Sequence, residues 1–247
     1  MKRIIYSIIA LIYFTNGINA QNRSSKNKEV AEHSVLDKSQ PFEGFFTFNY
    51  QPETDAIYLS VKELEQHFLY VNSLSQGIGS NDIGLDRGQL GNERVVYFRK
   101  AGSKLLLIQP NLRYRSTSEN PLEQRSIKEA FAKSVLFGFP IEETKDGSYI
   151  INLTPFLMQD AHGVSKRLKQ MKQGSFSVDK SRSAINFERT KAFPLNVEFD
   201  ILLTFTGEAQ GNLLRSVTPT PDAVTVHQHH SFVALPDTNY TPRDFDP

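Results

Sequence analysis

Two imidazoles two residues apart are the clearest candidates for metal chemistry in this sequence. They belong to His227-Gln228-His229-His230, inside Val224–Leu235 (VTVHQHHSFVAL), a stretch that is typical of a β-strand. Because side chains two apart on a strand point to the same face, His227 and His229 are placed to share one zinc ion. A zinc site needs at least three protein ligands, and no third is identifiable, so a solvated sheet face is the simpler interpretation. His227 and His229 are the only metal candidates, and we predict no catalytic or cofactor-binding residue.

The motifs of the common catalytic classes are missing from the sequence. None of the six histidines is followed by Glu, so there is no HExxH zinc helix, and neither a GxSxG elbow nor a P-loop occurs. Asp160-Ala161-His162 has the residue types of an acid–base pair, but a helix cap beside a surface histidine is the simpler interpretation. The glycines from Gly77 to Gly91 lack the strand-then-helix context of a phosphate cradle and indicate a surface loop.

Composition narrows the classes of protein further. The 247 residues are 39% hydrophobic, 11% aromatic and 22% charged, which excludes collagen, a coiled coil and wholesale disorder. With no cysteine, the chain has no disulfide, no cysteine-ligated zinc and no thiol nucleophile. A domain of this length is large enough to bury a core without such cross-links.

The N-terminus has the form of an export signal. Lys2 and Arg3 precede an apolar run of about 11 residues, too short to span a membrane, and a small-residue site ends at Ala20. We predict a signal peptide over 1–20 that is cleaved after Ala20, with a permanent membrane anchor as the alternative, and an exported protein in the periplasm, at the cell surface or secreted. Cleavage leaves 26 basic and 27 acidic residues, a net charge of −1, which gives no electrostatic case for nucleic acid or anionic lipid.

The remaining chain divides into a flexible lead-in and one β-rich domain. Residues 21–40 are polar and without periodicity, so we expect a flexible segment there and a folded domain over 41–247. Two hairpins are predicted, 43–50 with 56–61 and 94–99 with 104–109, and Asp146-Gly147 is typical of a third hairpin turn.

Helices are predicted at three places. Ser60–Glu63 and Ser126–Glu129 have the pattern of capping boxes, the second opening a helix that runs on to Gly138. Thr154 before Pro155 predicts a short helical stretch towards Met171, interrupted at Gly163.

The longest predicted strand is Leu195–Thr206 (LNVEFDILLTFT). Apolar and polar residues alternate along it, with Leu202 as the exception, which predicts an antiparallel strand with one wet face. Many strands with about three short helices indicate an α+β fold, a twisted and mostly antiparallel sheet.

Five stretches of this sequence resemble, in order, the N-terminal region of a family of large secreted bacterial zinc-dependent metalloproteases. They are Ile83–Gly88 (IGLDRG), Val95–Arg115, Ala130–Ile141, Arg182–Phe205 and His229–Pro247. In that family the region is a domain of unknown function before a catalytic domain that holds HExxH. The resemblance implies zinc in the parent's catalytic domain and no cofactor in this chain, and it carries over no zinc ligand and no catalytic Glu.

Two functions from different classes follow. The first is a non-catalytic accessory domain that packs against the catalytic domain of the same polypeptide, shapes its substrate cleft and contacts peptide or protein substrate. The second is an independent extracytoplasmic module that binds peptides or glycans through aromatic side chains, of which there are 18 Phe and 9 Tyr, and through a sheet edge. Whether the chain is itself an enzyme is left open by the sequence.

Overall fold

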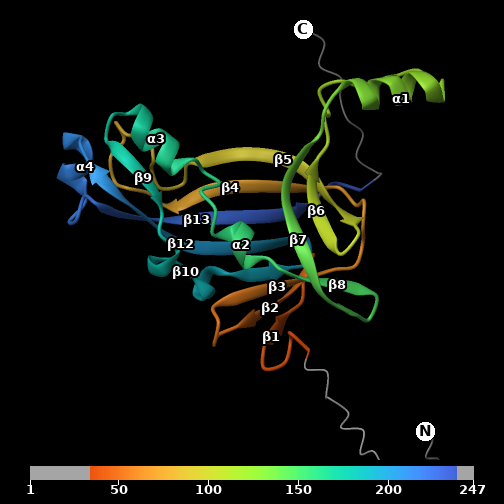
Figure 1. Ribbon diagram of the computed structural model, residues 1–247, viewed down its shortest axis with the longest axis horizontal. Coiled ribbons are helices and arrows are strands. Elements are labelled where there is room, and N and C mark those ends of the chain that lie inside the picture. The colour runs from red at the N-terminus through yellow and green to blue at the C-terminus, as the bar shows by residue number, and fades with distance from the viewer. Residues whose placement is uncertain (1–33, 238–247) are drawn as a thin grey trace, which may run out of the picture. The chain divides into compact units, whose positions relative to one another are not determined.

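A computed structural model describes residues 34–237, and Figure 1 shows the arrangement of their elements. The predicted signal peptide and residues 21–33 of the predicted lead-in lie outside the described residues. The strands are β1 (Gln40–Phe42), β2 (Thr47–Gln51), β3 (Ala56–Val61), β4 (Phe68–Gln76), β5 (Leu90–Ala101), β6 (Lys104–Gln109), β7 (Ser134–Lys145), β8 (Ser148–Asn152), β9 (Gly174–Val178), β10 (Ala184–Ile185), β11 (Lys191–Phe193), β12 (Asn196–Ala209) and β13 (Ala223–Ala234). The helices are α1 (Pro121–Ala130), α2 (Thr154–Leu157), α3 (Val164–Gln170) and α4 (Asn212–Val217), with the 3-10 turns η1 (Lys180–Arg182) and η2 (Phe187–Arg189).

The described residues form a mostly antiparallel β-sheet with four α-helices. The strand order is β1-β2-β3-β8-β7-β6-β5-β4-β13-β12-β10, and β9 and β11 also pair with β12. All of these pairings are antiparallel. The predicted predominance of antiparallel strands is confirmed, and the three predicted hairpins are β2–β3, β5–β6 and β7–β8. In the described range, no helix has the length and apolar character needed to cross a membrane.

The core lies between strands that are far apart in this order. Phe48 on β2 packs edge-on against Phe199 on β12, with ring centroids 5.3 Å apart. Nearby, Phe46 contacts Phe232 on β13, and the N–H of Phe45 donates to the carbonyl of Phe193 at 2.7 Å. The two ends of the strand order therefore meet around a shared aromatic core. Its largest fully buried side chains include Tyr70, Phe48, Phe68, Phe98, Phe139, Phe199, Phe205 and Phe232.

The long predicted strand is β12, and its apolar face is buried as expected. Its polar face is not wet along its whole length, because Asp200 and Thr204 are buried as well. The segment from Asp179 to Thr190 runs beside the strand, and Thr204 Oγ1 donates to the carbonyl of Arg182 at 2.6 Å. The expectation of one solvated face is therefore wrong at these two positions. The segment from Asp179 to Thr190, which precedes β12 in the chain, covers them.

The prediction of a helix after Ser60 is wrong. Ser60 lies within β3, where it pairs with Thr47 of β2, and Glu65 has a left-handed backbone with φ 61°. The next residues form β4, in which Phe68, Tyr70, Asn72 and Leu74 are buried alternately. The period of two over these β-forming residues outweighs the local capping pattern.

Helix α1 begins earlier and ends earlier than the capping box at Ser126 predicts. Asn120 caps it by accepting from the N–H of Leu122 at 3.0 Å, and Pro121 occupies the first turn. After Ala130 the chain returns to the sheet as β7, so Val135 is a strand residue. None of the α1 side chains is buried, and Figure 1 shows the helix projecting beyond the strands.

The other helical prediction is close to the observed structure. The stretch opened by Thr154-Pro155 forms α2 and, after a left-handed Gly163 with φ 82°, α3.

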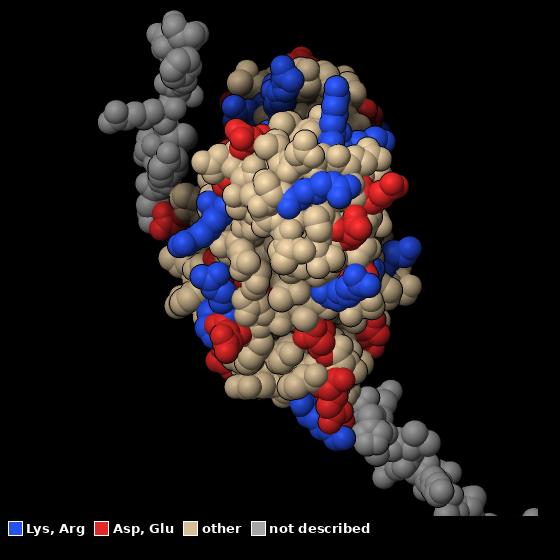
Figure 2. Space-filling view, turned by 90° about the vertical axis from the view of Figure 1, so that its left-hand side faces the viewer, with Lys and Arg blue, Asp and Glu red and all other residues tan. Residues whose placement is uncertain are grey.

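The end of the molecule that carries α3 and α4 has Lys and Arg intermingled with Asp and Glu, and neither sign gathers there (Figure 2). This face therefore has no single-signed charge patch of the kind that steers a polyanion.

The glycine-rich loop is better packed than a surface loop. Ile83 and Leu85 are buried, and Arg167 Nε of α3 donates to the carbonyl of Ile83 at 2.5 Å. The loop is therefore tied to α3 by a side chain, while its glycines at Gly79 and Gly88 stay exposed.

Candidate functional site

The register of β12 and β13 brings the two predicted imidazoles to one face. His229 lies opposite Asp200 and His227 opposite Leu202. The side chain of His229 is 23% exposed and that of His227 is 18% exposed, so this face of the sheet is largely covered rather than solvated. What surrounds the imidazoles is not a third nitrogen ligand but a pair of carboxylates.

The buried carboxylate of Asp200 lies between the two histidines. Its Oδ1 is 2.9 Å from His227 Nδ1, and its Oδ2 is 3.4 Å from His229 Nδ1, within ion-pair distance. Asp200 also accepts from Asn186 Nδ2 at 2.9 Å and from the hydroxyl of Ser75. Both carboxylate oxygens of Asp200 are thus engaged by groups of the chain itself.

A second carboxylate completes the cluster. Glu198 Oε2 is 2.7 Å from His229 Nε2 and also accepts from the hydroxyl of Ser231. Burial alone lowers the pKa of His229, but its contacts with Asp200 and Glu198 outweigh this and raise the pKa to about 9. For Glu198 and Asp200, burial acts to raise the pKa, yet the contacts with His229 and the hydrogen bonds from neighbouring side chains hold the pKa of each below its ordinary value. The cluster at neutral pH is therefore an imidazolium between two carboxylates.

The polar atoms of this cluster mostly contact one another. An imidazolium has no free lone pair for a metal, and the oxygens of Asp200 already accept hydrogen bonds. Within residues 34–237, no group of three or more His, Asp or Glu side chains is arranged to hold a metal ion. The sequence placed His227 and His229 together correctly, but it did not reveal their carboxylate partners, which come from β12 in the register of the pairing.

His230 faces the opposite way and was not singled out by sequence reasoning. It is fully buried, with Nδ1 2.9 Å from Tyr70 Oη and Nε2 3.0 Å from Gln228 Nε2. Burial lowers the pKa of His230 to about 3, so it is neutral. The sequence did hold a signal for this burial. His230 lies an even number of positions from the apolar residues Val226 and Phe232, which share its face of the strand and are buried too.

Asp160 is a helix cap, as the simpler interpretation predicted. Its carboxylate accepts from the N–H groups of Gly163, Val164 and Ser165 at 2.7 to 2.9 Å, at the start of α3. His162 is half-buried rather than on the surface, and burial lowers its pKa. With three amides on the Asp160 carboxylate, the two side chains do not form an acid–base pair.

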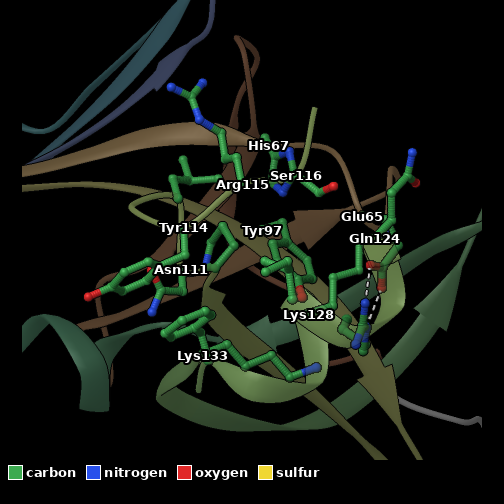
Figure 3. Close-up of a pocket in the computed structure, with 15 residues that line it drawn as sticks. Glu65, His67, Tyr97, Asn111, Tyr114, Arg115, Ser116, Gln124, Lys128 and Lys133 are labelled. Atoms are coloured by element: carbon green, nitrogen blue, oxygen red, sulfur yellow. Dashed lines mark hydrogen bonds and ion pairs between the residues drawn. The ribbon is translucent and has the colours of Figure 1, made fainter. Parts of the chain in front are cut away.

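A groove that no sequence motif indicated lies between the β5–β6 hairpin and the excursion that carries α1. We call it the α1 groove; its volume is about 710 Å³, and Figure 3 shows the side chains that line it. They combine aromatic rings with basic groups and come from three parts of the chain. These are Glu65 and His67, then Tyr97 and Arg99 of β5, and then Pro110, Asn111, Leu112, Tyr114, Arg115 and Ser116 with Gln124, Ile127, Lys128, Phe131 and Lys133.

Comparison with known families identifies the class of domain but no activity. Residues 88–247, almost two thirds of the chain, match the family described as "Domain of unknown function (DUF5117)". The chain therefore belongs to this family of domains of unknown function. No curated protein and no solved structure matches it.

Proposed function

We propose that this chain is a non-catalytic N-terminal domain of a secreted zinc-dependent metalloprotease, which packs against the catalytic domain of the same polypeptide and shapes its substrate cleft. The proposal is supported by the ordered resemblance of five sequence stretches to that region of the metalloprotease family. It is also supported by the lack of an HExxH motif anywhere in the 247 residues. In this proposal the zinc belongs to the catalytic domain, and this chain contributes no ligand to it.

The observation that carries the proposal is an exposed apolar patch where β13 ends. Phe193, Leu195 and Leu235 are 46%, 69% and 39% exposed. They are neighbours through the backbone, because Phe193 pairs with Asn196 and the N–H of Ala234 donates to the carbonyl of Leu195 at 2.8 Å. Large apolar side chains gathered on a surface are typical of an interface. We infer that the catalytic domain covers this patch.

The interface is tested by titrating the separately produced catalytic part of the parent polypeptide into this chain in a calorimeter. We expect binding, and at least a tenfold loss of affinity for Leu195→Asp and for Phe193→Asp, because each change buries a charge in the contact. Leu90→Asp is the matched control, since Leu90 is 72% exposed on β5. Absence of binding by the unaltered chain, or equal loss in the control, refutes the proposed interface.

The lack of catalysis is tested on the isolated chain. Metal analysis of the purified protein should find no stoichiometric zinc, and a casein assay should show no cleavage, because the motif that supplies two zinc ligands and a general base is missing. Stoichiometric zinc or EDTA-sensitive cleavage contradicts the assignment as an accessory domain.

A further inference from the structure

We propose that the α1 groove is a binding site for an acidic peptide in an extended conformation. The inference concerns residues other than the Phe193, Leu195 and Leu235 patch, and it does not rest on the metalloprotease assignment. It rests on three properties of the groove: a rigid aromatic lining, an excess of positive charge and an unpaired stretch of backbone.

The aromatic lining is held in place by its own contacts. Tyr114 and Phe131 stack with centroids 3.8 Å apart and an interplanar angle of 7°. Tyr97 is fixed by the guanidinium of Arg99 at 5.2 Å over its ring and by an edge contact with His67 at 5.1 Å. Tyr97 is only 6% exposed and adds little open surface, whereas Tyr114 is 44% exposed. The stacked pair of Tyr114 and Phe131 therefore offers most of the apolar contact area to a ligand, at little entropic cost. One class of side chain in the ligand should therefore be apolar.

The charged groups of the groove are predominantly basic. Its single carboxylate, Glu65, is held by two hydrogen bonds from Arg99 at 2.7 and 2.8 Å, which lower the pKa of Glu65. Arg115, Lys128 and Lys133 form no ion pair among the residues that the structure describes. Lys133 also interacts with Glu65 and lowers its pKa, so it is partly compensated. Among the described residues that line the groove, Arg99, Arg115, Lys128 and Lys133 still outnumber the one carboxylate, and charge complementarity calls for a ligand with carboxylates.

The backbone along one wall favours a peptide over an anionic glycan. Residues 110–119 connect β6 to α1 without pairing to any strand, and within the described part of the chain they make no backbone–backbone hydrogen bond. Side chains satisfy the N–H groups of Arg113 and Ser118 only. The chain bends at Arg113–Tyr114 and again at Glu119, so the stretch between the bends, residues 115–118, is the part that can accept an extended peptide as an added strand. A glycan does not share this mode of binding. Alternating side chains of the peptide would then reach the rings and the cations in turn.

Fluorescence anisotropy on the full chain tests the site, with a fluorescein-labelled nine-residue peptide of alternating glutamate and leucine as the probe. We expect saturable binding that weakens as NaCl is raised from 50 to 500 mM, because screening reduces the attraction. The double variant Lys128→Glu, Lys133→Glu should bind at least tenfold more weakly. The matched control is Lys166→Glu, Lys169→Glu on α3, where both lysines are exposed, and it should stay within twofold of the unaltered chain.

A second probe separates strand pairing from simple charge attraction and needs no variant of the protein. The same peptide, N-methylated at alternate residues along one edge, keeps its charge but loses the N–H groups that pair with the chain. It should bind at least tenfold more weakly than the parent probe. Equal binding of the methylated peptide, equal loss in the control variant, or tighter binding of an oligogalacturonate of equal charge would each overturn the proposal. Far-UV circular dichroism confirms that the variants are folded.

Discussion

Replacing His229 with glutamine should remove a pH-dependent contribution to the stability of the fold. In the native protein the His229 ring lies 2.7 Å from Glu198 Oε2 and 3.4 Å from Asp200 Oδ2, and these contacts raise its pKa from 6.5 to about 9. Such a rise corresponds to about 3 kcal/mol in favour of the folded state. Because the folded pKa is above the unfolded value, this stabilisation is complete below pH 6.5 and is lost as the pH rises towards 9.

The variant His229→Gln should therefore be about 3 kcal/mol less stable than the native chain at pH 6, where it leaves two mostly covered carboxylates without their imidazolium. The difference should shrink to less than about 1 kcal/mol near pH 9.5. His67→Gln is the control, because His67 is exposed and lies outside the cluster of His229, Glu198 and Asp200, and this variant should keep the alkaline loss of the native chain. The chain has no cysteine, so no thiol titrates in this interval.

Urea denaturation followed by far-UV circular dichroism, repeated at half-unit steps from pH 5 to pH 10, measures these differences.

On the acid side of the pH range, the buried His230 has the opposite effect on stability. Its pKa falls to about 3 on folding, so the unfolded chain binds a proton that the folded chain excludes, and stability declines as the pH falls below 6.5. We expect a maximum near pH 6.5. A native chain whose stability is unchanged between pH 6.5 and 9, or a His229→Gln variant with the same alkaline loss as the native chain, refutes the reasoning.

Three further predictions concern the core, a cap and the export signal. Phe199→Ala should reduce the free energy of unfolding by about 3–5 kcal/mol, because the ring is fully buried against Phe48. Phe193→Ala, at an exposed site, should change the free energy of unfolding by less than about 1 kcal/mol, and urea denaturation distinguishes the two variants. Asp160→Ala should cost about 0.5–2 kcal/mol through loss of the α3 cap, and amide hydrogen exchange should rise first in that helix; unchanged exchange there contradicts the role. Protein recovered from the natural host should begin at Gln21 by intact-mass measurement, and retention of the first 20 residues would favour the membrane anchor.

The sequence predicted the strands better than the helices, for a physical reason. The alternation in β12 is long and is reinforced by pairing with β13 over its length, so local pattern and tertiary contacts agree. At Ser60 they disagree, because the capping pattern is local while the pairing partner Thr47 and the buried face of β4 are set by the whole sheet. At α1 a helix does form, but Asn120-Pro121 is a stronger start signal than the capping pattern at Ser126.

The sites differ in how far they could be predicted. Parity along β13 was enough to place His227 and His229 on one face and to imply that His230 lies on the other. Their partners Glu198 and Asp200 depend on the register between β12 and β13, which one sequence does not supply. The α1 groove joins residues from separate segments, Tyr97 on β5 with Tyr114 and Phe131, so no linear motif could have indicated it.

The central claim, that this chain is the non-catalytic part of a larger metalloprotease, is tested most directly by reading the coding sequence that follows the codon for Pro247 in the natural gene. We predict that the frame stays open and encodes an HExxH motif within a few hundred codons. A stop codon directly after Pro247, or an open frame without a zinc motif, would contradict the claim.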